Sequence, residues 1–224
     1  DPNLILNTLK GILIRGVDPT EIAKHIAYTA ALRMAHFPES NDINDWFGPL
    51  HTFTYSNAIY QTLKRSINYN TIRGILHGAM SVYVDRFLNI PKAKFPDEHI
   101  DLESLSTEPD ELLESIFKNL DRRQSWDTVT APVSRYIRLQ HPVDPLIDTL
   151  AKATLREDLD FHKLQCLEAG AQQAQLWAGQ PEEEHIYIAV SRHLAAHCPT
   201  RRAESQMTRT AIRLHRGESL YEEI

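Results

Sequence analysis

The sequence predicts an all-α protein of about ten helices in two packed halves, and two observations carry this prediction. Helix start signals recur along the chain, as at Asp18-Pro19-Thr20-Glu21, where the aspartate can cap a helix and the proline fits its first turn. Strand signals are weak, because the chain has no Asn-Gly or Asp-Gly hairpin turn and few segments in which apolar and polar residues alternate.

Four helices are predicted in the first half, with boundaries good to ~2–4 residues. The second begins at Asp18-Pro19 and the third at Gly48-Pro49. The fourth carries an apolar stripe at three- and four-residue steps, from Ile72 to Phe87. The predicted ranges are 3–15, 19–36, 49–66 and 69–89.

Six helices are predicted in the second half. Glu108-Pro109, Asp144-Pro145 and Gln180-Pro181 mark three starts, with acidic residues near each first turn, which the helix dipole favours. The last helix carries arginines that form either a solvated basic face or a site for an anion or an acidic partner. The predicted ranges are 109–122, 131–140, 145–157, 160–178, 182–197 and 200–216.

These helices are expected to form a single domain, 1–224, because 42% hydrophobic residues suffice for a buried core. It divides into an N-terminal half, 1–90, and a C-terminal half, 109–224. The proline- and acid-containing stretch 91–108 is the expected connecting loop. The chain opens on Asp1 rather than Met, so we expect a piece of a longer protein with an upstream domain.

Composition excludes several partners. A net charge of −6 gives no basic field for nucleic acid. The apolar runs fall far short of the roughly 18 residues that a membrane span needs. The two cysteines form no CxxC pair, which indicates a reducing compartment, and we expect a cytoplasmic protein.

The chain has 11 histidines, and the helix 69–89 holds one of interest. His77 shares a ridge of four-residue steps with Ser81 and Asp85, beside Gly74 and Gly78. One interpretation is a polar seam in which His77 acts as acid, base or ligand. The alternative, which we favour, is a tight helix crossing with an ordinary hydrogen-bonded histidine. Both place His77 against another helix or a cavity.

Two other regions are candidates for chemistry. His51 lies in the first turn of a helix, where the dipole favours a neutral imidazole able to accept a proton, and Tyr55 lies one turn on. His162 precedes Cys166 by four residues, as His193 precedes His197, which is a spacing that suits metal ligands. Surface or separately hydrogen-bonded histidines are the alternative. A metalloprotease is excluded, because Leu194 stands where the zincin signature needs a glutamate.

Four stretches together resemble the C-terminal helical half of a bacterial family of longer proteins often labelled Rieske-type iron–sulfur proteins. The resemblance covers about residues 5–216 and implies no established reaction for this half. Rieske centres need paired cysteine and histidine motifs, and no such histidine follows Cys166 or Cys198, so we expect no iron–sulfur cluster in this chain. The stretches are LHTFTYSNAIYQTL, RGILHGAMSVYVDRFLNIP, LREDLDFHKLQCLEAGAQQ and HIYIAVSRHLAAHCPTRR.

Two local resemblances are weaker. The segment KGILIRGVDPTEIAKHIAYTAALRMAHF resembles a helix pair of the carboxymuconolactone decarboxylase and AhpD-like fold, without the CxxC of its redox members. His51-x-x-Thr54 and Asp160-Phe161-His162-Lys163 resemble questin-oxidase-like helical proteins. That resemblance implies an oxidative transformation of a small organic molecule.

Two hypotheses follow. In the first, the protein is a small-molecule enzyme of oxidative type, with a neutral histidine as general base and Tyr55 or Asp85 orienting it or the substrate. A subsidiary version adds iron or zinc bound by His162, His193 and His197. In the second, the protein is a non-catalytic scaffold that docks a redox partner or dimerises through Gly74 and Gly78. The expected pocket of the first hypothesis lies between the halves and is lined by His51, His77, His162, His193 and His197.

Overall fold

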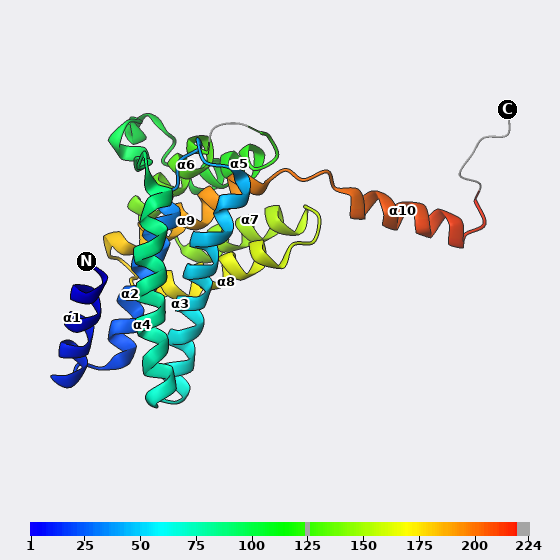
Figure 1. Cartoon of the computed structure of the whole chain (residues 1–224). Coiled ribbons are helices and arrows are strands. Elements are labelled where there is room, and N and C mark those ends of the chain that lie inside the picture. Colours follow the sequence, from blue (N-terminus) through cyan, green and yellow to red (C-terminus); the bar gives the residue numbers. More distant parts are fainter. Residues whose placement is uncertain (124–125, 219–224) are drawn as a thin grey trace.

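The computed structural model describes residues 1–123 and 126–218, and these residues form ten α-helices and no strand (Figure 1). The all-α prediction is confirmed. Short 3₁₀ turns lie at Ile43–Trp46 (η1), Arg86–Asn89 (η2), Pro96–Glu98 (η3) and Leu102–Ser104 (η4). The helices are α1 Pro2–Ile14, α2 Pro19–Ala35, α3 Phe47–Arg65, α4 Tyr69–Asp85, α5 Pro109–Asn119, α6 Asp127–Arg138, α7 Val143–Leu155, α8 Phe161–Gln175, α9 Pro181–His197 and α10 Ala203–His215.

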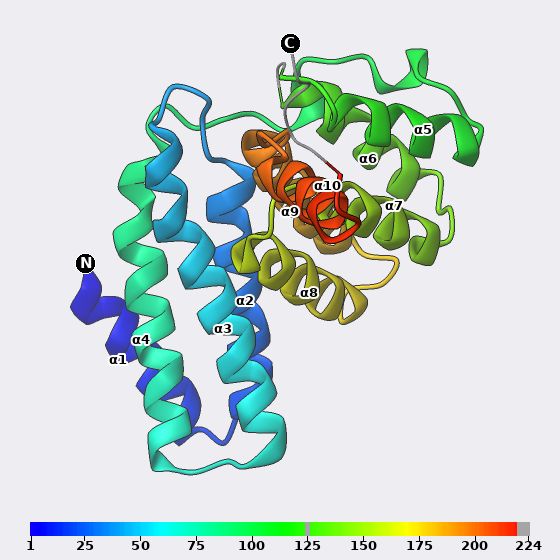
Figure 2. The ribbon, with the colours of Figure 1, turned by 90° about the vertical axis from the view of Figure 1, so that its right-hand side faces the viewer.

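Helices α2, α3 and α4 run alongside one another, and helices α5 to α9 gather beside their upper part (Figure 2). Helix α2 joins the two groups, because it packs against α3 and α4 on one side and against α9 on the other. One large core cluster draws on both groups, from Met34 and Phe53 to Leu112 and Ile186. A smaller cluster around Ile22 and Ile75 fills the far end of α2, α3 and α4.

Aspartate side chains cap helix starts, as the sequence predicts. The Asp18 carboxylate accepts a hydrogen bond of 2.8 Å from the Thr20 backbone N–H at the start of α2. The Asp160 carboxylate caps α8 in the same way, 2.9 Å from the His162 backbone nitrogen. Each cap satisfies a donor that the first turn of a helix leaves without an internal partner.

Helix α6 begins at Asp127, four residues before the predicted start at 131, and it contains Pro132 in its interior. Proline has no N–H, so the carbonyl of Thr128 loses the donor that normally lies four residues on. The Asn119 side-chain amide replaces it, donating to the Thr128 carbonyl oxygen at 2.8 Å. A side chain of α5 therefore supplies the hydrogen bond that the proline cannot donate.

The connecting stretch 91–108 is packed onto the helices. The Phe95 ring stacks on His185 with centroids 4.5 Å apart and tilts against His36 at 4.4 Å. Within the stretch, Pro96 and Leu102 are buried. The stretch thus closes the end of the bundle. None of the described helices is long and apolar enough to cross a membrane.

The glycines of α4 serve a tight helix crossing. A Cβ atom added to Gly78 would lie 3.3 Å from both Ile26 Cγ2 and Ser56 Oγ, so α2 and α3 come close on this face. Consecutive helix residues point about 100° apart, and His77 is therefore carried off this face and is exposed. The expectation that His77 faces another helix or a cavity is wrong.

Candidate active site

A cavity of about 680 Å³ lies where the end of α9 meets the segment that follows it. Small-molecule sites usually measure about 300–1,000 Å³. Its apolar lining includes Ile43, Trp126, Ala195, Ala196 and Pro199, and its polar lining includes His197, Thr200, Arg123, Arg201 and Asp158. The wall carries two arginines against one aspartate, and the Asp158 carboxylate already accepts a hydrogen bond from the Glu204 backbone N–H. A partly apolar wall with this excess of positive charge suits a small organic anion.

His197 is the titratable ring in the cavity wall. Its Nδ1 lies 2.8 Å from the His193 carbonyl oxygen, four residues back along α9. A carbonyl oxygen can only accept, so Nδ1 carries the hydrogen and Nε2 holds the lone pair. Burial lowers the pKa of His197, which keeps the ring neutral near pH 7. His197 therefore offers Nε2 as a proton acceptor.

His193 lies directly behind His197, with ring centroids 4.2 Å apart. The side chain is 1% exposed, and neither ring nitrogen has a hydrogen-bond partner in the protein. Burial, together with electrostatic coupling to His197, Lys163 and His162, holds the pKa of His193 well below its usual range. Leaving a buried polar atom unpaired costs roughly 1–3 kcal/mol. Such atoms call for an explanation, and function is one of them.

Trp46 shares this buried position. Its ring lies edge-on to His193 at 5.3 Å and to His197 at 6.1 Å. The indole Nε1 is also buried without a partner. The Trp46 ring therefore packs against both imidazoles.

A buried cation lies at the start of α8. The Lys163 side chain is 3% exposed, and its ammonium donates to the Asp158 carbonyl oxygen at 3.3 Å and lies 3.8 Å from Asp160 Oδ2. Its positive charge disfavours protonation of both His193 and His197. Lys163 thus helps to hold the imidazole pair neutral.

A second imidazole pair lies at the surface beside the first. His51 at the start of α3 and His162 at the start of α8 have ring centroids 5.1 Å apart. Phe47 and Phe161 flank His162 at 5.1 and 4.0 Å. His162 Nδ1 donates to Asp160 Oδ1 at 3.1 Å. His162 lies close enough to lower the pKa of His193 and His197 electrostatically, so the fold brings four of the candidate histidines to one region.

Three candidates from the sequence lie elsewhere, and none of them lines the cavity. His77 is exposed on α4. The Tyr55 hydroxyl donates to the Gly74 carbonyl oxygen at 3.3 Å, inside the α3–α4 crossing. Asp85 is buried near Arg33 and accepts a hydrogen bond from Thr52, and burial raises its pKa. These residues do not orient a base at His197.

The predicted metal ligands do not assemble. In the ranges that the structure describes, no group of three or more His, Cys, Asp or Glu side chains could hold a metal ion, His162, His193 and His197 included. Two ring nitrogens of these residues are already used, because His162 Nδ1 donates to Asp160 and His197 Nδ1 donates to a carbonyl.

Both cysteine thiols are unreactive because they are buried. Cys198 lies in the cavity wall, and burial raises its pKa to about 11. Cys166 is completely buried in the core, and burial raises its pKa as well. Because the thiolate is the nucleophilic form, both cysteines are inert at neutral pH.

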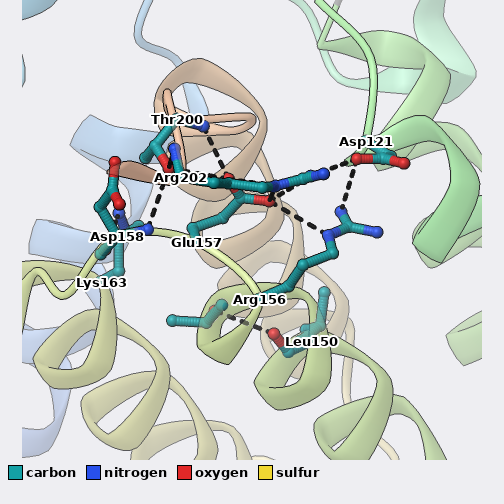
Figure 3. A network of polar contacts seen from close by, with 9 residues as sticks. Asp121, Leu150, Arg156, Glu157, Asp158, Lys163, Thr200 and Arg202 are labelled. Carbon is teal, nitrogen blue, oxygen red and sulfur yellow. Dashed lines mark hydrogen bonds and ion pairs between the residues drawn. The ribbon is translucent and has the colours of Figure 1, made fainter. Parts of the chain in front are cut away.

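An ionic network fixes the cavity wall after α9 (Figure 3). The Glu157 carboxylate is fully buried and accepts hydrogen bonds from the Thr200 backbone at 2.7 Å and from Arg202 Nη2 at 2.7 Å. Burial alone would raise the pKa of Glu157, but hydrogen bonds from Arg202, Thr200 and Arg156 outweigh it and lower the pKa to about 2. Arg202 also pairs with Asp121. The segment that carries Thr200 and Arg201 is thereby tied to the α7–α8 connection.

Sequence reasoning missed several of these groups. Lys163 directly follows the candidate His162, and its polarity gives no sign that its side chain is buried. Trp46, Trp126 and Arg123 reach the site from segments far from α9 in the sequence. No local pattern links these positions, because only the folded chain brings them together.

Comparison with known proteins assigns no family. No family model matches the chain, and no curated protein or solved structure is found to be similar to it. The resemblances noted in the sequence stay predictions, and the functional assignment depends on the geometry of the cavity and its histidines.

Proposed function

We propose that this protein is an all-α enzyme that binds a small organic anion in the cavity and removes a proton from it at His197. The observation that carries the proposal is a neutral, tautomer-fixed imidazole in the wall of a ligand-sized cavity. A general base must be unprotonated at the working pH, and the burial of His197 achieves this.

The lining favours a ligand of particular chemistry. Trp126, Ile43 and the alanines accept an apolar or aromatic body, and Arg123 and Arg201 pair with a carboxylate or another anionic group. Nε2 of His197 takes the proton from an acidic O–H or C–H. The negative charge left on the ligand is then stabilised by the positive groups around the cavity.

His193 is the positioning residue. Its carbonyl oxygen accepts the Nδ1 hydrogen of His197 and so selects the basic tautomer. Its ring packs against His197 at an angle of 41° and restricts that ring's orientation. The oxidative reaction type expected from the sequence would follow deprotonation and would need an electron acceptor in addition to these residues.

The second candidate function is a scaffold that docks another protein, and the isolated position of α10 favours it, since α10 has no buried residue. The location that we propose is the cytoplasm, which suits two free, buried thiols.

Two separate measurements, one of ligand binding and one of proton transfer, test the first proposal. A panel of small aromatic carboxylates and α-keto acids is titrated calorimetrically against the full chain and against Arg201→Ala. Deuterium exchange into each ligand is followed by NMR in heavy water. We expect binding that weakens about tenfold in Arg201→Ala.

His197→Gln should retain binding and lose exchange by roughly 100-fold or more. Exposed His77→Gln is the matched control and should behave as the wild type. The proposal fails if no member of the panel binds, or if His197→Gln exchanges ligand protons at the wild-type rate.

A further inference from the structure

The far end of helices α1 to α4 extends beyond the rest of the helical body (Figure 2). Two turns lie there, one joining α1 to α2 and the other joining α3 to α4, and Figures 1 and 2 place both at the same end. Helices α5 to α9 gather at the opposite end. We call this far end, made of residues 10–21 and 64–73, the basic tip.

Both turns of the basic tip expose large apolar side chains. In and beside the first turn, Ile14 is 86% exposed and Val17 is 42% exposed. In and beside the second turn, Ile67 is 55% exposed and Tyr69 is 75% exposed. Exposed apolar side chains that gather in one place are typical of an interaction site.

The tip is basic, although the whole chain carries a net charge of −6. Two acidic residues, Asp18 and Glu21, stand against five cationic residues, which leaves an excess of three positive charges. All five cationic residues are exposed, and in the part of the chain that the structure describes none of them forms an ion pair. They are Lys10, Arg15, Lys64, Arg65 and Arg73.

Aromatic rings accompany two of these cations. The Arg73 guanidinium lies 5.7 Å from the centre of the Tyr69 ring, and the Lys64 ammonium lies 5.8 Å from the centre of the Tyr60 ring. Arginine, lysine and tyrosine each combine an apolar body with a polar end. Such side chains suit the boundary between water and a lipid bilayer, where tyrosine is enriched.

We propose that the basic tip binds the surface of an anionic lipid bilayer, with Ile14, Val17 and Ile67 entering the boundary between the headgroups and the acyl chains. The cations then lie at the level of the headgroups, where the negative surface potential attracts them. Apolar burial and attraction to anionic lipid add together in contacts of this kind. The proposal does not depend on the proton-transfer chemistry at His197.

Charge and shape favour a lipid surface over other occupants. A tip-to-tip contact between two copies would bring ten cations together, and like charges repel. A specific protein partner needs a surface of complementary shape. A fluid bilayer can instead close around side chains that protrude from two separate turns.

Sedimentation of the full chain with lipid vesicles tests the proposal. Phosphatidylcholine vesicles that contain phosphatidylserine should bind the chain at least about tenfold more tightly than pure phosphatidylcholine vesicles. Salt at about 0.5 M should weaken the binding, because it screens the charges. Arg65→Gln should weaken it about fivefold, which is the usual contribution of one basic residue near an anionic surface. Ile67→Ser should weaken it about tenfold, since an apolar side chain no longer leaves water.

Arg209→Gln and Val84→Ser are the matched controls. Arg209 is an exposed arginine on α10, and Val84 is 59% exposed near the other end of α4. Neither substitution should change the binding to vesicles. Arg65 and Ile67 are exposed in the folded chain, so their substitution should leave the fold intact, and urea denaturation checks this.

A fluorescent label locates the contact. Both native cysteines are buried, so a cysteine introduced by Ile67→Cys or by Val84→Cys can be labelled selectively with an environment-sensitive dye. Vesicles that contain phosphatidylserine should shift the emission of the label at position 67 to the blue. The label at position 84 should keep its emission.

The proposal fails if the chain does not bind vesicles that contain phosphatidylserine. It fails as well if Arg65→Gln and Ile67→Ser bind them like the wild type, or if both labels shift equally. Binding to a polyglutamate peptide without binding to the vesicles would overturn it in favour of an acidic protein as the partner of the tip.

Discussion

At the scale of single residues, the histidines differ by what surrounds them and not by their own chemistry. His197 and His193 lie on the inward face of α9 and are held neutral by burial. His77 was a candidate on the same grounds of spacing, and it lies in solvent. His193 and His197 share a ridge of α9 with Ile186 and Val190, and Ile186, Val190 and His193 are buried.

Glu157 is the residue whose loss should cost the most stability outside the apolar core. Replacing it with Gln leaves the guanidinium groups of Arg202 and Arg156 without their shared carboxylate. Breaking a buried ion pair from one side costs about 3–5 kcal/mol, and we expect the lower end because Arg202 is partly exposed. Urea denaturation at neutral pH measures the free energy of unfolding.

Glu114→Gln is the control for this substitution. Glu114 pairs with Lys118 one turn away on α5, and both side chains are more than half exposed. Pairs of this kind contribute about 0.3–0.5 kcal/mol. If the two variants lose similar amounts of stability, the network around Glu157 does not hold the segment after α9.

At the scale of elements, the proline signals predicted helix starts well, except where a proline lies inside a helix. The ranges 109–122 and 182–197 begin within one residue of α5 and α9. The prediction 131–140 misses the first turn of α6, because Pro132 is an interior residue there. The compensating contact comes from Asn119, on a different helix, and no local pattern could reveal it.

A double-mutant cycle tests that compensation. Asn119→Ala should lower the free energy of unfolding by roughly 1–2 kcal/mol, because the Thr128 carbonyl loses its donor. In a Pro132→Ala background the same change should cost clearly less, since the backbone N–H that the substitution restores can then donate to the Thr128 carbonyl. Equal costs in both backgrounds, measured by urea denaturation, would show that the two residues are not coupled.

At the scale of the whole molecule, buried imidazoles make stability depend on pH. Burial lowers the pKa of His36 from 6.5 to about 4, and the pKa values of His193 and His197 are lowered too. Below pH 6.5 these histidines bind protons in the unfolded chain but stay unprotonated in the folded chain. The contribution of these neutral histidines to the free energy of unfolding is therefore present in full above pH 6.5. It decreases as the pH falls toward 4, by at most about 1.4 kcal/mol per pH unit for each histidine.

His193→Phe should flatten this dependence between pH 6.5 and 5, and the exposed His77→Phe should keep the wild-type slope. Denaturation by urea at several pH values gives both slopes. Below pH 4.5 the Glu157 contribution is lost as well, since its pKa in the folded protein is about 2. A slope that His193→Phe leaves unchanged would contradict the assignment of His193 as a buried neutral ring.

The sequence alone determined the helical class and the approximate positions of the helices, because these follow from spacing and capping within about twenty neighbouring residues. It could not determine which polar groups would share a site. His197, Trp126 and Lys163 come from three separate segments, and only their packing creates the cavity and the buried charges around it. Burial, which moves the pKa values and selects the tautomer of His197, is a property of the assembled fold.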